Sequence, residues 1–322
     1  MRGRAAAAPL SLAVLLGVAL GLATGQANRL ADQSIRRGLA DVGHGVQILL
    51  AGRAATLAGM SRVSIQEEQV RKRLRNRDER ADALDQAERC RALLGAAWVL
   101  VTDERGILVV RTDSPEEVDA DLSRGALVAG ALTGESSSGA WLDDRVHRLF
   151  LAVAVPLGAE PATRAKPEGA LVAAYALDDS LALEIRRATS ADVVLFALDT
   201  LNRPYVVGST LPRDAVGQAL AADTALFHRF ASDSTPAEVR AVVGEEHLIG
   251  LTSPIRSGGG DAFGGVIVFR SREREAGTFA WLRRTVAVAF ALGLGLAAWA
   301  ALRYLRTRDT PGPPSTRPAA VR

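Results

Sequence analysis

Two long runs of apolar residues stand near the two ends of the chain. They cover residues 5–24 and 285–302, and neither contains a charged side chain. About 20 apolar residues in a helix cross the ~30 Å hydrocarbon core of a bilayer. Arg2 and Arg4 precede the first run and three arginines follow the second, so the positive-inside rule places both ends in the cytoplasm. The pattern predicts two membrane anchors with the intervening chain outside the cytoplasm.

Each run has a second interpretation. Residues 23–25, Ala-Thr-Gly, also suit signal-peptide cleavage, which would remove the first anchor from the mature protein. The second run, if it were not an anchor, would be a buried core helix. Either alternative leaves residues from about 28 to 280 outside the cytoplasm.

A helical pattern follows the first run. Apolar residues recur at spacings of mostly three and four, which predicts one long helix over residues 26–62. The stripe consists of Ile35, Leu39, Val42, Val46, Leu49, Leu50, Leu57 and Met60. It would serve either to pack against the chain's own sheets, which we favour, or to pair with a second copy in a homodimer. A charged helical stretch over residues 65–94 comes next.

From residue 97 the pattern changes to short strands and turns. The run WVLVTDERGILVVRTD, residues 98–113, predicts a β-hairpin. Ser114 is placed to cap a helix ending near Gly134, and strands follow over residues 145–158 and 169–177. The same order recurs about 95 to 100 residues later, beginning with the hairpin VVLFALDTLNRPYVVGST at residues 193–210. Pro212 then opens a helix to about Phe230, before strands over residues 247–258 and 264–271. The repeat predicts a duplicated domain of the α+β class.

Composition removes several classes of function. Seven of the 39 basic residues but only one of the 36 acidic residues lie in the two end segments, so the chain between them carries a slight negative charge. The high isoelectric point is therefore no sign of nucleic-acid binding. Cys90 is the only cysteine, which rules out an intramolecular disulfide and a thiolate zinc site.

Motifs for catalysis, metal binding or cofactor binding are absent from the sequence. The four histidines show no metal-ligand spacing, and no nucleophile-elbow, Walker or dinucleotide pattern occurs. SGGGDAFGG, residues 257–265, is interpreted as a hairpin loop, and the adjacent acids Asp143 and Asp144 as solvated loop residues. We therefore expect no enzyme, no metal and no cofactor.

A small-molecule pocket is the hypothesis that the side chains favour. Five residues fall on the strands or strand edges of the first repeat: Arg111, Trp141, Arg145, His147 and Tyr175. Arg145 and His147 would share one face of a strand. Arginine suits a carboxylate or phosphate ligand, while the aromatic rings would form apolar walls. The alternative is that these residues are ordinary surface charges and sheet-packing aromatics.

The two anchors, the long helix and the two hairpin units together resemble the double Cache family of extracytoplasmic sensors. That resemblance implies a long N-terminal helix and two tandem PAS-like domains between two transmembrane helices. The expected segments are residues 1–25 (first transmembrane helix), 26–96 (long helix and helical connector), 97–180 (membrane-distal domain), 181–272 (membrane-proximal domain), 273–305 (helix continuing into the second transmembrane helix) and 306–322 (disordered cytoplasmic tail).

The resemblance implies ligand sensing of the kind found in bacterial chemoreceptors, histidine kinases and cyclases, with the ligand in the membrane-distal domain. The amino-acid-binding motif of some members is not matched, so the ligand stays open. Most members continue into an output domain, whereas about 20 residues follow the second anchor here. We therefore expect a sensor in the bacterial inner membrane, in contact with lipid, that signals through a separate protein. The alternatives are a truncated receptor or a structural or interaction module without a small-molecule ligand.

Overall fold

The computed structural model describes residues 4–143, 145–158, 166–233 and 235–271, with a few positions between 288 and 299, and its side chains from residue 33 onward. The chain divides into two units, Ile35–Arg272 and the two end segments together. The first predicted anchor lies outside the residues whose side chains are described, and only a few positions of the second are described. Within the described part, no single helix has the length and apolar character to span a bilayer. Only a pair bent by 99°, Gln33–Ser64 with Glu68–Leu74, reaches that threshold, by length and composition.

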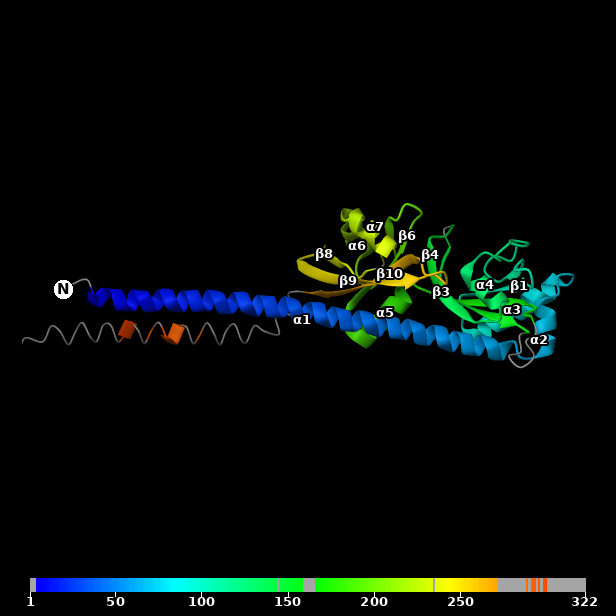
Figure 1. Ribbon diagram of the computed structural model, residues 1–322, viewed down its shortest axis with the longest axis horizontal. Coiled ribbons are helices and arrows are strands. Elements are labelled where there is room, and N and C mark those ends of the chain that lie inside the picture. The colour runs from blue at the N-terminus through cyan, green and yellow to red at the C-terminus, as the bar shows by residue number, and fades with distance from the viewer. Residues whose placement is uncertain are drawn as a thin grey trace, which may run out of the picture. The chain divides into compact units, whose positions relative to one another are not determined.

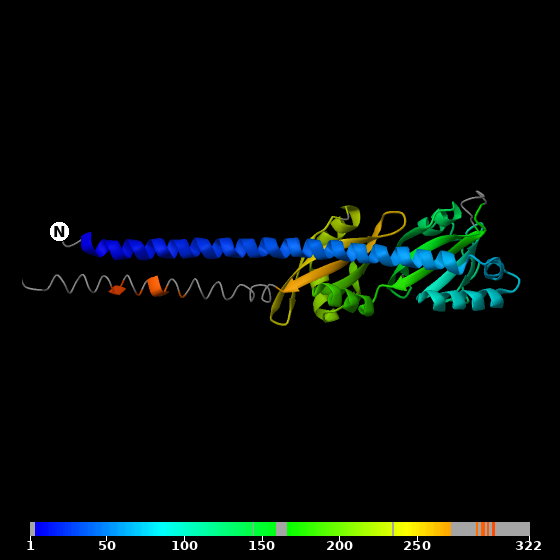
Figure 2. The same ribbon diagram turned by 90° about the horizontal axis from the view of Figure 1, so that it is seen from below.

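A single helix of 61 residues, α1 (Arg4–Ser64), opens the chain. From Ile35 onward it belongs to the compact unit and runs alongside both sheets, as the two views in Figure 1 and Figure 2 show. The buried members of its apolar stripe are Ile35, Leu39, Val46, Leu50 and Leu57. They join the core formed by the two sheets. The stripe therefore packs within the chain, as favoured from the sequence, and only Met60 among its members is exposed.

The first sheet is reached through two short helices, α2 (Glu68–Leu74) and α3 (Arg80–Leu94). Its five strands are all antiparallel, in the order β2-β1-β5-β4-β3. They are β1 (Trp98–Asp103), β2 (Leu108–Arg111), β3 (Ser137–Asp143), β4 (Arg148–Leu157) and β5 (Gly169–Ala176). The helix α4 (Ala126–Leu132) packs on one face, against β3, β4 and β5.

The second sheet repeats this plan in the order β7-β6-β10-β9-β8. Its strands are β6 (Asp192–Leu198), β7 (Pro204–Ser209), β8 (Glu238–Val243), β9 (Glu246–Arg256) and β10 (Ala262–Ser271). The helix α5 (Asp179–Thr189) joins the two sheets, while α6 (Arg213–Ala222) and α7 (Thr224–Asp233) pack on the second one. The predicted α+β class with two tandem antiparallel-sheet units behind a long helix is confirmed, and the matching strand orders bear out the duplication.

The core has three parts because each sheet buries both of its faces. Leu171 and Ala173 of β5 face the layer that α1, α3 and α5 share with both sheets. The alternate residues, such as Val172, face a second layer beneath α4. The second sheet has its own layer beneath α6 and α7, where Ile267 of β10 points. A strand that is buried on both faces consists of consecutive apolar residues, and the sequence of these strands shows such runs.

The predicted start of the helix after Ser114 is wrong. The helix begins only at Ala126, and the chain before it runs along the edge of β2. Leu108 N–H donates to Ala120 C=O, and Asp119 N–H donates to Leu108 C=O. Arg80 from α3 also donates to backbone carbonyls of this segment. These long-range bonds compete successfully with local helix formation, so the capping signal at Ser114 is not used.

Three further details differ from the sequence prediction. Strands β3 and β8 were not foreseen, and they complete each sheet to five strands. The helix expected from Pro212 is two helices that meet near Asp223. Arg145 and His147 lie in the turn between β3 and β4 instead of on a strand, because His147 adopts a left-handed backbone with φ of 50°. They therefore do not share a strand face as predicted.

Candidate functional site

A buried arginine lies at the end of β2, on the sheet face that α4 covers. Arg111 pairs across the sheet with Leu100 of β1, so its side chain points to the same face as Trp98 and Leu100. The whole residue is only 5% exposed. Its guanidinium donates two hydrogen bonds to Asp113, from Nε to Oδ1 at 2.7 Å and from Nη2 to Oδ2 at 2.9 Å. This two-pronged geometry is the strongest that arginine forms with a carboxylate.

Two further carboxylates reach the same guanidinium. Arg111 Nη2 donates to Asp143 Oδ2 at 3.0 Å, and Nη1 donates to Glu117 Oε2 at 3.2 Å. Burial by itself lowers the pKa of Arg111, but the hydrogen bonds and charges of these acids outweigh it and raise the pKa. Arg111 is therefore firmly cationic.

Asp143 is the most buried acid of the group, at 8% exposure. Burial works to raise the pKa of its carboxyl, but Arg111 and the backbone and charge of Arg145 lower it more strongly. Arg145 N–H donates to Asp143 Oδ1 at 3.2 Å, and its guanidinium also bonds Glu117 Oε2 at 3.2 Å. Two arginines therefore face three carboxylates, and the group carries one surplus negative charge.

Aromatic side chains form the inner wall of this group. The Arg111 guanidinium lies 5.3 Å from the ring centre of Trp98, a cation–π contact. Trp141 and Phe150 pack edge-on against Trp98, with ring centres 5.3 and 5.6 Å away. We call the seven residues of this site the Arg111 cluster: Trp98, Arg111, Asp113, Glu117, Trp141, Asp143 and Arg145.

One polar group in the Arg111 cluster has no partner. Trp98 is 1% exposed, and its indole Nε1–H makes no hydrogen bond to any described residue. Over 90% of buried polar groups in native proteins have a partner in protein or ordered water. In native proteins an ordered water or a bound molecule satisfies such a donor when the protein does not.

The structure unites three of the five predicted site residues and separates two. Arg111, Trp141 and Arg145 belong to the cluster. Tyr175 lies on the opposite face of the sheet, where its hydroxyl donates to Leu94 C=O at 3.1 Å. His147 packs instead against Tyr205 of the second sheet, with ring centres 5.2 Å apart.

Sequence reasoning missed four members of the cluster. Trp98 opens the hairpin run two residues before Leu100, so the two-residue strand period already placed it on the face of Arg111's partner. Asp113 and Glu117 gave no signal beyond their closeness to Arg111 in the chain. Asp143 was taken for a solvated loop acid, which is wrong because it ends β3 and is buried against Arg111.

The Arg111 cluster contains no cysteine, serine or histidine that could act as a nucleophile. Cys90 is buried in α3, away from the cluster, and burial raises the pKa of its thiol. The described ranges contain no group of three or more His, Cys, Asp or Glu side chains that could hold a metal ion.

Comparison with known proteins gives matches only among solved structures. No protein-family model matches the chain, and no curated protein sequence does. The ligand-binding domain of the Campylobacter jejuni chemoreceptor Tlp3 in complex with 4-methylisoleucine is 11% identical, with a TM-score of 0.43, covering 77% of this chain and 93% of that one. The sensor domain of the Vibrio cholerae histidine kinase DctB is 12% identical, with a TM-score of 0.45 and coverages of 77% and 99%.

A third similar structure is the periplasmic domain of Vibrio cholerae LuxQ, at 12% identity, a TM-score of 0.42 and coverages of 73% and 100%. The first two of these structures are a chemoreceptor ligand-binding domain and a histidine-kinase sensor domain. At such identities and TM-scores the likeness extends to the fold alone.

Proposed function

We propose that this chain is a membrane-anchored extracytoplasmic sensor that binds a small polar molecule at the Arg111 cluster. The two apolar end segments support the anchoring, and the cluster supports the binding. Residues 35–271, where described, are taken up by helices and the two sheets. The proposal therefore assigns the output step to a separate protein or to residues outside this region, and it assigns no catalysis to the chain.

The unpartnered Trp98 Nε1–H is the observation that carries the proposal. A buried donor left without an acceptor costs about 1–3 kcal/mol of stability. A bound molecule with an acceptor atom at this position would remove that cost only while it is bound.

The charges of the cluster define the ligand further. The Nε and Nη2 donors of Arg111 already bond to Asp113, so they are not free to bind the carboxylate or phosphate of a ligand. The surplus negative charge favours a donor group, such as an ammonium or hydroxyl, on the side of Glu117 and Asp143. The best-suited ligand is small, neutral or zwitterionic, with an acceptor atom facing the Nε1–H of Trp98.

The test is a thermal-shift screen of polar metabolites on the full chain in lipid nanodiscs. A ligand that binds only the folded state raises the melting temperature. Trp98→Phe keeps an aromatic ring but removes the N–H, so it should weaken binding of a true ligand about tenfold, the worth of a hydrogen bond. Phe196→Leu, in the core of the second sheet, is the matched control and should leave binding unchanged.

Two results would count against the proposal. If no compound raises the melting temperature, an interaction module without a ligand becomes the better description. If compounds bind Trp98→Phe as tightly as the native chain, the orphaned N–H is not a ligand contact.

The membrane topology has a separate test. A reporter enzyme that is active only outside the cytoplasm should work when fused after Gly158 and fail when fused after Arg308. The opposite pattern would refute the two-anchor arrangement.

A further inference from the structure

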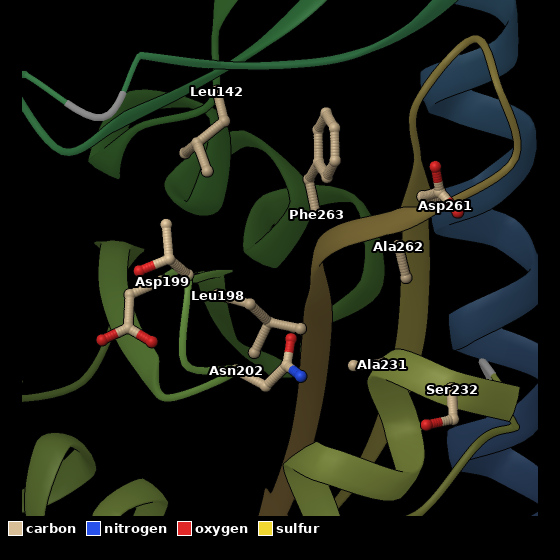
Figure 3. A pocket seen from close by; sticks show the side chains of 10 residues that line it. Leu142, Leu198, Asp199, Asn202, Ala231, Ser232, Asp261, Ala262 and Phe263 are labelled. Atoms are coloured by element: carbon tan, nitrogen blue, oxygen red, sulfur yellow. The ribbon is translucent and has the colours of Figure 1, made fainter.

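A cavity lies at the junction of the two sheets, on the other face of β3 from the Arg111 cluster. Its volume is about 450 Å³, within the range of sites for small organic molecules. Figure 3 shows Leu142 of β3 and Phe263 of β10 in the upper half of the view, with Leu198 and Asn202 below them. Asp261, in the loop before β10, stands at one side. The first sheet contributes Leu142, and the second sheet contributes the rest of these residues.

We propose that this cavity is a second binding site, for a small organic amine with an apolar body. This inference goes beyond the proposed function, because it concerns a different site and a different ligand. The apolar part of the cavity is formed by Leu142, Leu198 and Phe263. Phe263 is 37% exposed and lines the cavity.

The polar side chains that line the cavity differ in whether they already form hydrogen bonds within the protein. Asp199 is fully engaged by its own hairpin, since its Oδ1 accepts from the N–H groups of Leu201 and Arg203 and its Oδ2 accepts from Arg203 Nε. Of the polar residues that line the cavity, Thr200, Asn202 and Asp261, by contrast, make no side-chain hydrogen bond with any described residue. They are the groups available to an incoming molecule.

The charge of these free groups selects the ligand. Arg203 offsets the charge of Asp199. Arg256, the arginine nearest to Asp261 in the chain, donates to Gly260 C=O at 2.9 Å instead of to the carboxylate. No described cation forms an ion pair with Asp261, an exposed side chain beside an apolar surface. An ammonium group would satisfy it while its hydrocarbon part covers Phe263, whereas an anion would be repelled.

The position of the cavity gives its occupant a possible effect on the first site. Side chains alternate along β3, so Leu142 faces the cavity while its neighbours Trp141 and Asp143 face Arg111 on the other side of the strand. Ala140 and Ser257 also form a parallel bridge between the two sheets. A molecule bound against Leu142 therefore contacts the strand that carries part of the Arg111 cluster.

The experiment is titration calorimetry of the full chain in nanodiscs with phenethylamine, using empty nanodiscs to subtract partitioning. The anionic probe 3-phenylpropionate has the same ring and nearly the same length. We expect saturable binding of phenethylamine and none of 3-phenylpropionate. Asp261→Asn should weaken the amine about fivefold, the effect of removing one exposed charge partner. Glu245→Gln, an exposed acid in the turn between β8 and β9, is the matched control and should change nothing.

The two sites are told apart by Trp98→Phe, which should leave phenethylamine binding intact. The inference is overturned if phenethylamine shows no saturable binding up to about 10 mM. It is also overturned if both probes bind alike, or if Asp261→Asn and Glu245→Gln have equal effects. Loss of amine binding in Trp98→Phe but not in Asp261→Asn would place the amine at the Arg111 cluster, which refutes this site and leaves the proposed function standing.

Discussion

Replacing Arg111 by methionine should strongly destabilise the first sheet. Methionine fills a similar volume against Trp98 but leaves the three carboxylates without their central cation. Asp113 and Glu117 have side chains that are 31% and 30% exposed, so water can solvate them. The Asp143 side chain is only 8% exposed, and it keeps the exposed Arg145 as its partner at 3.7 Å.

The expected loss follows from this single buried carboxylate. Breaking a buried ion pair by removing one partner costs about 3–5 kcal/mol. Because two of the three acids can be hydrated, we expect the lower end, about 3 kcal/mol. For a folded unit the size of Ile35–Arg272, this corresponds to a fall of roughly 6–12 °C in melting temperature.

The pH dependence provides an internal check. In the native chain the pKa of Asp143 is lowered, so its contribution to stability is present above the unfolded pKa of about 3.9 and is lost as the pH falls through the folded value. In Arg111→Met the burial that favours the neutral acid is no longer opposed by Arg111. Protonation of Asp143 then stabilises the variant, and the difference in stability from the native chain should shrink as the pH falls from neutral through about 4 and below.

The assay is thermal unfolding followed by circular dichroism at several pH values between neutral and the acid limit of solubility. The double variant Arg111→Met with Asp143→Leu should recover most of the loss, since replacing a buried ion pair by apolar residues is often neutral. A single-variant loss below about 1 kcal/mol, or a double variant that is no better than the single one, would refute the idea that the ion pair is energetically coupled in this way.

Two further predictions concern packing within the compact unit. Leu57→Ala on α1 should cost about 2–5 kcal/mol because Leu57 is fully buried, whereas Ile48→Ala on the outer face, at 60% exposure, should stay within about 0.5 kcal/mol. Denaturant unfolding measures both, and equal losses would contradict the packing of α1. Gly139→Val should push the β9–β10 loop away from β3, because a Cβ atom there would lie 2.4 Å from Gly258 N. Faster tryptic cleavage after Arg256 is the expected readout, and an unchanged rate would show that this contact is not maintained in solution.

Local pattern was enough to predict most of the architecture. The apolar stripe from Ile35 to Leu57 predicted both the helix and its buried face, since apolar residues with a period near 3.6 are typical of an amphipathic helix. The two hairpin runs defined β1–β2 and β6–β7, and their recurrence implied the repeated sheet. Strand β8 carried a usable signal as well, because Val239 and Ala241 are buried between exposed or partly exposed neighbours.

Other elements had no adequate local signal. Strand β3 contains serines, a glycine and an aspartate, and it becomes a strand because β4 offers a free edge to pair with. The segment after Ser114 has an acceptable helix cap, yet its backbone bonds to β2 and α3 are worth more. Propensity is a weak prior when long-range hydrogen bonds are available.

The sequence by itself determined the long helix, the duplication, the α+β class and the presence of an arginine and a tryptophan in the first repeat that could form a site. Only the tertiary structure decided which acids meet Arg111, because Asp113 and Glu117 lie in the segment after β2 whereas Asp143 ends the distant strand β3. It likewise decided that Tyr175 faces away and that Trp98 is buried with an unpaired N–H. The physical reason is that the burial of a side chain and its ion pairs depend on residues that are distant in sequence and close in space. The spacing of residues along one strand contains no information about those distant residues.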